Sequence, residues 1–73
     1  MIASRKCIGG PLDGKILEID AIYDITIFFK SLGGGAHVYE SEAVNPLEIC
    51  YHWKGVIPAW QAKGVVRDLP QQK

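Results

Sequence analysis

The chain has 73 residues, of which 48% are hydrophobic and 22% are charged, a composition typical of one small globular domain and too apolar for a disordered chain. Eight basic and eight acidic residues cancel, so no net positive charge attracts a phosphate backbone, and nucleic-acid binding is disfavoured. No stretch approaches the ~20 apolar residues of a membrane helix, and residues 1–6 lack the apolar run of a signal peptide. We therefore expect a cytoplasmic protein that does not bind membranes and keeps Cys7 and Cys50 as free thiols.

The first part of the sequence predicts a β-hairpin. Two short segments that each end in or contain apolar residues, 3–8 and 15–19, flank the turn-forming residues 11–14, Pro-Leu-Asp-Gly. Proline presets φ, aspartate bonds its own backbone and glycine accepts positive φ, which together favour a reversal of the chain. The two segments are therefore predicted to form an antiparallel strand pair.

Residues 22–30 and 47–54 carry the clearest strand pattern. In both segments, apolar residues recur at every second position, with mostly polar residues between them, as in a strand that is buried on one face. We expect the two segments to be neighbours that line a shared interior. The residues predicted to face this interior are Tyr23, Ile25, Ile27, Phe29, Leu47, Ile49, Tyr51 and Trp53.

The middle of the chain contains shorter elements. The three glycines of residues 33–35 predict a flexible loop or a wide turn. Residues 36–41 predict a short, more polar strand at an edge of the sheet, and Asn45-Pro46 predicts a turn. Gly55 is expected to end the strand that precedes it.

The C-terminal part is predicted to contain a helix. Residues 58–64 begin with proline and end with glycine, which suits about one or two helical turns, and so short a helix needs Trp60 to anchor it to the sheet. Residues 65–69 are expected to add a last strand, and residues 70–73 to fray. The predicted fold is mainly β: an antiparallel meander of about five strands with one short C-terminal helix, either a small SH3-like or OB-like barrel or an open sheet.

The aromatic residues give a candidate interaction surface. Most of the rings are needed for the core, but a domain of this size rarely hides both of its tryptophans, so Phe28 and Trp60 are expected to stay partly exposed. Exposed rings beside cations are typical of a protein-binding hot spot, and the alternative is a surface that stacks single-stranded bases. The residues assigned to this partner-binding surface are Phe28, Lys54, Trp60, Lys63 and Arg67.

The polar residues do not predict a reaction. Glu48, Cys50 and His52 share one side of a predicted strand, but the α-carbons of Cys50 and His52 are about 7 Å apart at normal strand rise, and we interpret the row as structural rather than as a thiolate–imidazole pair. Cys7, His37, Cys50 and His52 have the ligand types and number for tetrahedral zinc, yet they include no close pair of cysteines or of histidines. We therefore predict no catalytic residue, no metal and no cofactor, and these four side chains are the candidates if zinc binds.

Residues 8–14, Ile-Gly-Gly-Pro-Leu-Asp-Gly, resemble the N-terminal GGPxDG signature of small proteins from tailed bacteriophages and prophages. In that family, a hairpin that carries the signature precedes an aromatic-rich strand, often with tyrosine and tryptophan near the C-terminus. Residues 37–40 and 51–55 are similar in character, whereas residues 21–35 and 58–64 have no match. The resemblance implies a phage or prophage origin and brings no catalytic residues.

The function implied is that of a small accessory protein in the cytoplasm of a bacterial host. It would bind a host or phage protein and inhibit or modulate a host complex. A homodimer is also expected, formed either through an edge strand, for which residues 36–41 are the candidate, or through an uncovered face of the sheet. Three alternatives remain open: a small nucleic-acid-binding β-barrel, which a basic face around Lys54, Lys63 and Arg67 would favour, a minor component of the virion, and a zinc-binding protein.

Overall fold

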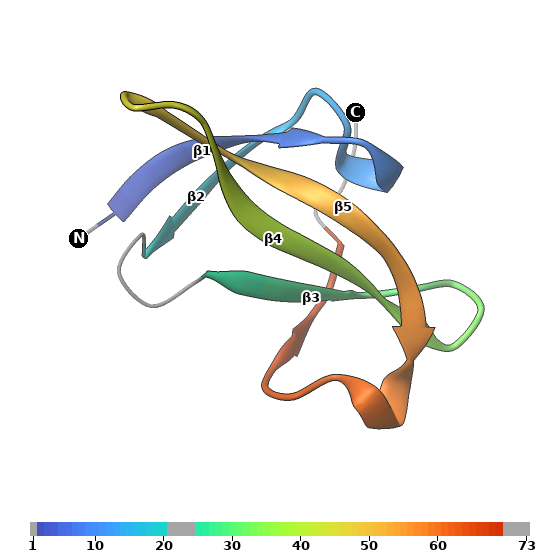
Figure 1. Ribbon diagram of the computed structural model, residues 1–73. Helices are drawn as coiled ribbons and strands as arrows, with labels where there is room; N and C mark the ends of the chain where they lie inside the picture. Colours follow the sequence, from blue (N-terminus) through green and yellow to red (C-terminus); the bar gives the residue numbers. More distant parts are fainter. Residues whose placement is uncertain (1, 21–24, 70–73) are drawn as a thin grey trace.

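A computed structural model describes residues 2–20 and 25–69. Its elements are strand β1 (Ile2–Ile8), the 3₁₀ turn η1 (Gly10–Leu12), strands β2 (Ile16–Asp20), β3 (Thr26–Lys30), β4 (Gly35–Asn45) and β5 (Glu48–Pro58), the 3₁₀ turn η2 (Ala59–Gln61) and strand β6 (Val66–Arg67) (Figure 1). The prediction of a mainly β fold is therefore confirmed.

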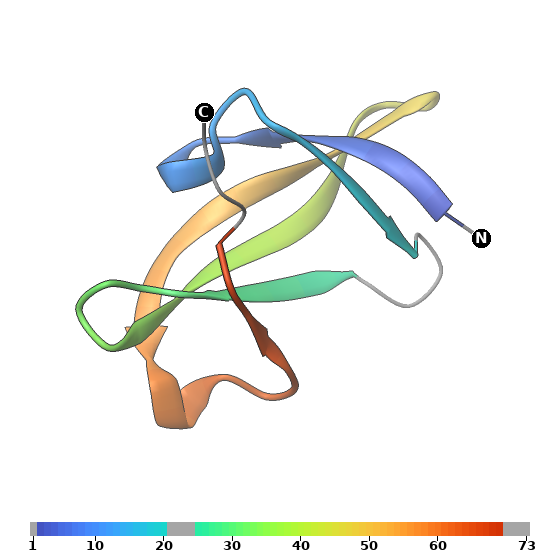
Figure 2. The ribbon, with the colours of Figure 1, turned by 180° about the vertical axis from the view of Figure 1, so that it is seen from behind.

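The strands form one mixed sheet, which differs from the predicted antiparallel meander. Their order across the sheet is β2-β1-β5-β4-β3-β6. The pairs β1–β2, β3–β4 and β4–β5 are antiparallel, whereas β1–β5 and β3–β6 are parallel. Figures 1 and 2 show that the sheet is strongly twisted and curls into half of a barrel. The prediction of a purely antiparallel sheet was wrong because turn residues reveal local reversals only, and both parallel pairs join segments that are distant in the chain.

The core lies on the inner face of this curl. Ile27 and Tyr39 are directly opposite on β3 and β4, and the edge of the Phe29 ring meets the Tyr39 ring at a centroid distance of 5.9 Å. Leu17 and Leu69 are partly buried against the same cluster, so the end of the described chain returns to the core. The buried cluster consists of Cys7, Leu12, Ile19, Ile27, Phe29, Tyr39 and Tyr51.

The predicted interior is confirmed for three residues, which are Ile27, Phe29 and Tyr51. Leu47 is 98% exposed because it lies in the turn between β4 and β5, and Ile25 is 63% exposed because it precedes β3, so both predictions were wrong. Ile49 and Trp53 are 40% and 38% exposed, so their predicted burial was wrong as well. The two predicted segments are also not neighbours, because β4 lies between β3 and β5. Tyr23, like the rest of 21–24 and 70–73, lies outside the described residues.

Strand β4 is an interior strand and not the edge strand predicted for residues 36–41. It pairs with β3 on one side and with β5 on the other, and β2 and β6 are the outermost strands of the described sheet. Ala36, Val38 and Tyr39 are buried. The polar residues that suggested an edge belong to the exposed half of the β4–β5 hairpin. A second copy therefore cannot join the sheet along this strand.

Gly55 was expected to end its strand, but this prediction was wrong. It makes a β-bulge within β5. The pairing moves from Tyr39↔Trp53 to His37↔Val56, so β5 contains one more residue than β4 over this stretch. The φ angle of Gly55 is +103°, a conformation that glycine adopts without the penalty that a side chain would bring. Strand β5 therefore continues to Pro58.

The three predicted chain reversals are confirmed. The glycine-rich turn joins β3 to β4, and in it the Gly34 N–H donates to the Ser31 carbonyl at 3.1 Å. Strands β1 and β2 pair from Ile2↔Asp20 to Lys6↔Ile16 around the loop that contains η1. In the β4–β5 turn, Asn45 Oδ1 accepts the N–H of Leu47 at 2.9 Å. This side-chain bond is the reason why asparagine favours the turn.

The predicted C-terminal helix is replaced by the single turn η2. The Ala62 N–H donates to the Ala59 carbonyl, and Ala62 is already extended. Trp60 is 81% exposed and does not anchor the segment to the sheet. One turn of helix without buried contacts is unstable in water, which explains the failure of this prediction. The strand predicted over residues 65–69 forms as the two-residue β6.

Candidate functional site

The GGPLDG segment, residues 9–14, is a loop that forms hydrogen bonds with the side chain of Tyr39. The Tyr39 hydroxyl donates to the Gly9 carbonyl at 2.7 Å and accepts the Leu12 N–H at 3.0 Å. The Asp13 carboxylate closes the loop by accepting the Gly9 N–H at 2.7 Å. Leu12 itself is fully buried. Much of this signature is therefore explained by packing and hydrogen bonding within the protein.

Gly10 and Trp53 make the second contact between this loop and the sheet. Gly10 has φ of +66°, and a β-carbon placed on it would lie 2.5 Å from Cγ of Trp53. Trp53 Nε1 in turn donates to Nδ1 of His37 at 3.1 Å. The indole is thus held between the loop and a histidine, and the sequence offered no signal for this contact because it joins three distant segments.

The four candidate zinc ligands are not brought together. Cys7 pairs with Tyr51, so Cys50 lies on the opposite face of the sheet from Cys7. His37 uses Nδ1 to accept from Trp53. Within the described residues, no group of three or more histidine, cysteine, aspartate or glutamate side chains is arranged to hold a metal ion.

The Cys7 thiol is expected to be a poor nucleophile and a poor metal ligand. It is fully buried, and burial, with a smaller contribution from Cys50, raises its pKa from 9.0 to about 11. A thiol must lose its proton to act as a nucleophile or a metal ligand. Cys7 therefore serves as a small apolar core residue.

This raised pKa predicts a loss of stability in alkaline solution. Because the folded-state pKa lies above the unfolded one, the stabilisation is fully present below pH 9.0 and is lost as the pH rises through about 11. Between about pH 8 and 10.5 we expect the unfolding free energy to fall by about 2 kcal/mol through Cys7. Urea titrations of the wild type and Cys7→Ala at both pH values measure this. Equal pH slopes for the two proteins would contradict the prediction.

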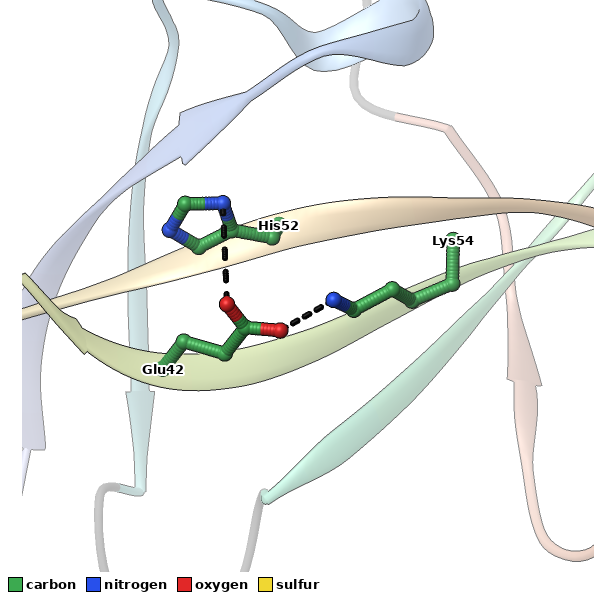
Figure 3. Close-up of polar contacts among 3 residues, drawn as sticks. All are labelled: Glu42, His52 and Lys54. Atoms are coloured by element: carbon green, nitrogen blue, oxygen red, sulfur yellow. Dashed lines mark hydrogen bonds and ion pairs between the residues drawn. The ribbon is translucent and has the colours of Figure 1, made fainter.

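Glu42, His52 and Lys54 form an ion cluster on the outer face of β4 and β5 (Figure 3). The Glu42 carboxylate accepts a short hydrogen bond from Lys54 Nζ and lies 4.0 Å from Nδ1 of His52. The Lys54 hydrogen bond lowers the pKa of Glu42, and Glu42 raises that of Lys54. Because the pair is open to solvent, it contributes little to stability.

This cluster replaces the row of Glu48, Cys50 and His52 suggested by the sequence. Glu42, on the neighbouring strand, faces His52, whereas Glu48 accepts a hydrogen bond from Asn45. Cys50 is buried, and no hydrogen bond joins it to His52 in the structure. The register between β4 and β5 decides which carboxylate reaches the histidine.

The predicted partner-binding residues fall into separate groups. Phe28 is half-buried on β3, where it pairs with Val66 of β6. Lys63 and Arg67 line a hollow of about 230 Å³ beside β3. Lys54 is engaged with Glu42 and lies outside this group. Phe28 does not line this hollow, and Arg67 is in register with Phe29 rather than with Phe28, so the five residues are not brought together on one surface.

Trp60 belongs to an exposed apolar region that the sequence revealed only in part. We call this region the Trp60 surface and define it as Leu32, Val56, Trp60 and Val65, which are 104%, 50%, 81% and 79% exposed. The segments that carry these residues lie close together: Gly35 pairs with Pro58. Ser31, Ala59 and Val66, from the β3–β4 turn, η2 and β6, line a shallow hollow of about 290 Å³, which none of the four exposed residues lines. The signal that could have identified Leu32 is its place beside a glycine-rich turn, where an apolar side chain has no core to enter.

Comparisons of the chain with family models, curated proteins and solved structures found no match. Over residues 2–20 and 25–69, no helix is long and apolar enough to cross a membrane.

Proposed function

We propose that this chain is a small accessory protein of a phage or prophage that acts in the bacterial cytoplasm by binding a host or phage protein. Its role would be to inhibit or modulate a complex of the host. The observation that carries the proposal is the exposure of Trp60, 81% of whose surface is open to solvent. Tryptophan is among the residues that contribute most to binding energy at protein interfaces.

The surroundings of Trp60 favour a protein partner. Leu32, Val56 and Val65 are further exposed apolar residues in segments close to η2, and exposed apolar side chains that gather in this way favour an interaction site. Lys63 follows η2 at its border. The complementary partner would offer an apolar pocket with an acidic rim, since charge complementarity at the rim guides association.

The same geometry disfavours nucleic acid as the partner. Lys30 forms an ion pair with Asp68 at 3.1 Å, and Lys54 is paired with Glu42. Two of the cations that could contact phosphate are therefore already neutralised. Nucleic-acid binding depends on several free cations acting together.

Substitution of Trp60 tests this proposal. Affinity capture from lysate of infected or lysogenic bacteria is expected to recover a protein partner with the wild type and to lose it with Trp60→Ala. With the purified partner, the dissociation constant should rise about thirtyfold, as expected for a hot-spot residue worth about 2 kcal/mol. The matched control is Val44→Ala, which removes an exposed apolar side chain near the far end of β4.

Three results would contradict the proposal. An unchanged partner in a folded Trp60→Ala protein would exclude this surface. Recovery of oligonucleotides alone, with steep salt dependence, would favour the nucleic-acid-binding alternative. Finding the chain in purified phage particles would favour a minor virion component.

A further inference from the structure

Strands β1 and β5 separate to form a cleft at the end of the sheet opposite Trp60. Their parallel pairing is confined to Cys7↔Tyr51 and Ile8↔His52, although β1 begins at Ile2 and β5 at Glu48. Figures 1 and 2 show the start of β1 and the β4–β5 hairpin fanning apart. The cleft between them has a volume of about 360 Å³.

The backbone on the β1 side of the cleft has hydrogen-bonding groups to offer. The Cys7 N–H donates to the Lys15 carbonyl of the β1–β2 hairpin at 2.8 Å. In an antiparallel pair, alternate residues direct their N–H and C=O groups to the partner strand. The odd-numbered residues of β1 therefore bond toward β2, and Ser4 directs its groups toward β5 and into the cleft.

The backbone on the β5 side is arranged in the same way. The Ser41 N–H donates to the Ile25 carbonyl on the β3 side of β4, so Ser41 and Ala43 bond away from β5. Ile49 is the partner of Ala43 and consequently directs its own groups away from β4, into the cleft. Two strand edges with the groups of Ser4 and Ile49 thus face each other across the gap.

An extended peptide has backbone groups that complement these two edges. Because β1 and β5 run parallel, one inserted strand can be antiparallel to both, and antiparallel pairing is slightly the more stable kind. Addition of an extended peptide to exposed strand edges is an established mode of recognition. Backbone hydrogen bonds provide the affinity in that mode, and side-chain contacts provide the specificity.

The side chains around the cleft indicate the chemistry of the peptide. Arg5 and Lys6 contribute two positive charges against the one negative charge of Glu48, and the exposed apolar residues Ile16 and Ile49 lie beside them. Neither cation is ion-paired with another described residue. A segment that combines acidic with aliphatic or β-branched residues is complementary to these walls.

We propose that the cleft binds an extended segment of another protein, rich in acidic and β-branched residues, as an added strand between β1 and β5. This site is distinct from the Trp60 surface and does not depend on the function proposed above. Strand β5, eleven residues long, lies between the two.

Selection from a random heptapeptide library on the immobilised protein tests the proposal. Enriched peptides are expected to combine acidic and β-branched residues, and fluorescence anisotropy with the labelled consensus peptide gives its dissociation constant. Ser4→Pro removes the N–H that faces the cleft, and we expect it to weaken binding about tenfold. Ser4→Ala keeps that N–H and is the matched control, with binding unchanged.

Two further measurements test the cleft even if Ser4→Pro fails to fold, and they distinguish the cleft from the Trp60 surface. N-methylation of alternate amides in the consensus peptide removes its backbone donors and should also weaken binding about tenfold. Trp60→Ala should bind the peptide like the wild type. The proposal is overturned if no consensus emerges, or if the methylated peptide binds normally. It is also overturned if the protein forms a dimer that Ser4→Pro abolishes, because a second copy would then fill the cleft.

Discussion

A Gly10→Ala variant is expected to lose about 3 kcal/mol of unfolding free energy, much of the stability of a chain this short. Gly10 has φ of +66°, and an added β-carbon would lie 2.5 Å and 2.6 Å from two ring atoms of Trp53 and 2.7 Å from the Tyr39 hydroxyl. Left-handed backbone costs a residue with a side chain about 1–2 kcal/mol, and forcing a methyl group into a packed contact costs about as much again. The melting temperature should fall by roughly 12–24 °C.

Gly14→Ala is the matched control for this variant. Gly14 also has positive φ, +82°, but a β-carbon there would meet no atom within 4 Å. Its cost should therefore be limited to the backbone penalty of about 1 kcal/mol. Thermal unfolding followed by circular dichroism compares the two. Equal losses at both positions would mean that the contact of the loop with Trp53 does not contribute to stability.

Tyr39→Phe is expected to destabilise the protein by about 2–3 kcal/mol while leaving the ring in place. The hydroxyl bonds both the Gly9 carbonyl and the buried Leu12 N–H. Without it, these backbone groups lose their partner, and an unsatisfied buried donor is costly. The edge-to-face contact of the ring with Phe29 remains, so the variant isolates the hydroxyl.

Hydrogen exchange gives a local readout for this second variant. The Leu12 amide should exchange faster in Tyr39→Phe, because it is held by the hydroxyl and not by a strand. Asp13→Ala is the control, since it removes an exposed bond to the Gly9 N–H in the same loop and should cost about 1 kcal/mol or less. Unchanged protection of Leu12 in Tyr39→Phe would contradict the role assigned to the hydroxyl.

The local features of the fold could be predicted from the sequence, and the long-range features could not. The alternating pattern correctly gave the burial of Ile27, Phe29 and Tyr51, and the turn residues gave the three hairpins. The parallel pairing of Cys7 with Tyr51 has no local signature, so the sheet order was missed. Gly55 was misread because a glycine that ends a strand and one that makes a bulge look the same in the sequence.

The candidate sites show the same division. The exposure of Trp60 was foreseeable from the size of the chain, but the other residues of the Trp60 surface come from the β3–β4 turn, from β5 and from the segment before β6. The Glu42 partner of Lys54 is set by the pairing of Glu42 with Cys50. The cleft between β1 and β5 could not be predicted at all, because it exists only where two strands from opposite ends of the chain diverge.

The pairing of β1 with β5 also determines when the fold can be completed. Cys7 and Tyr51 are neighbours in space but lie far apart in the chain, so their contact closes a long loop and is a slow, late event. During synthesis, the β1–β2 hairpin leaves the ribosome before β5, so its apolar side stays exposed until β5 has been synthesised. The hydrogen bonds between the glycine loop and the Tyr39 hydroxyl can form only after β4 has been synthesised. We therefore expect the N-terminal hairpin to become stable only when the rest of the sheet folds.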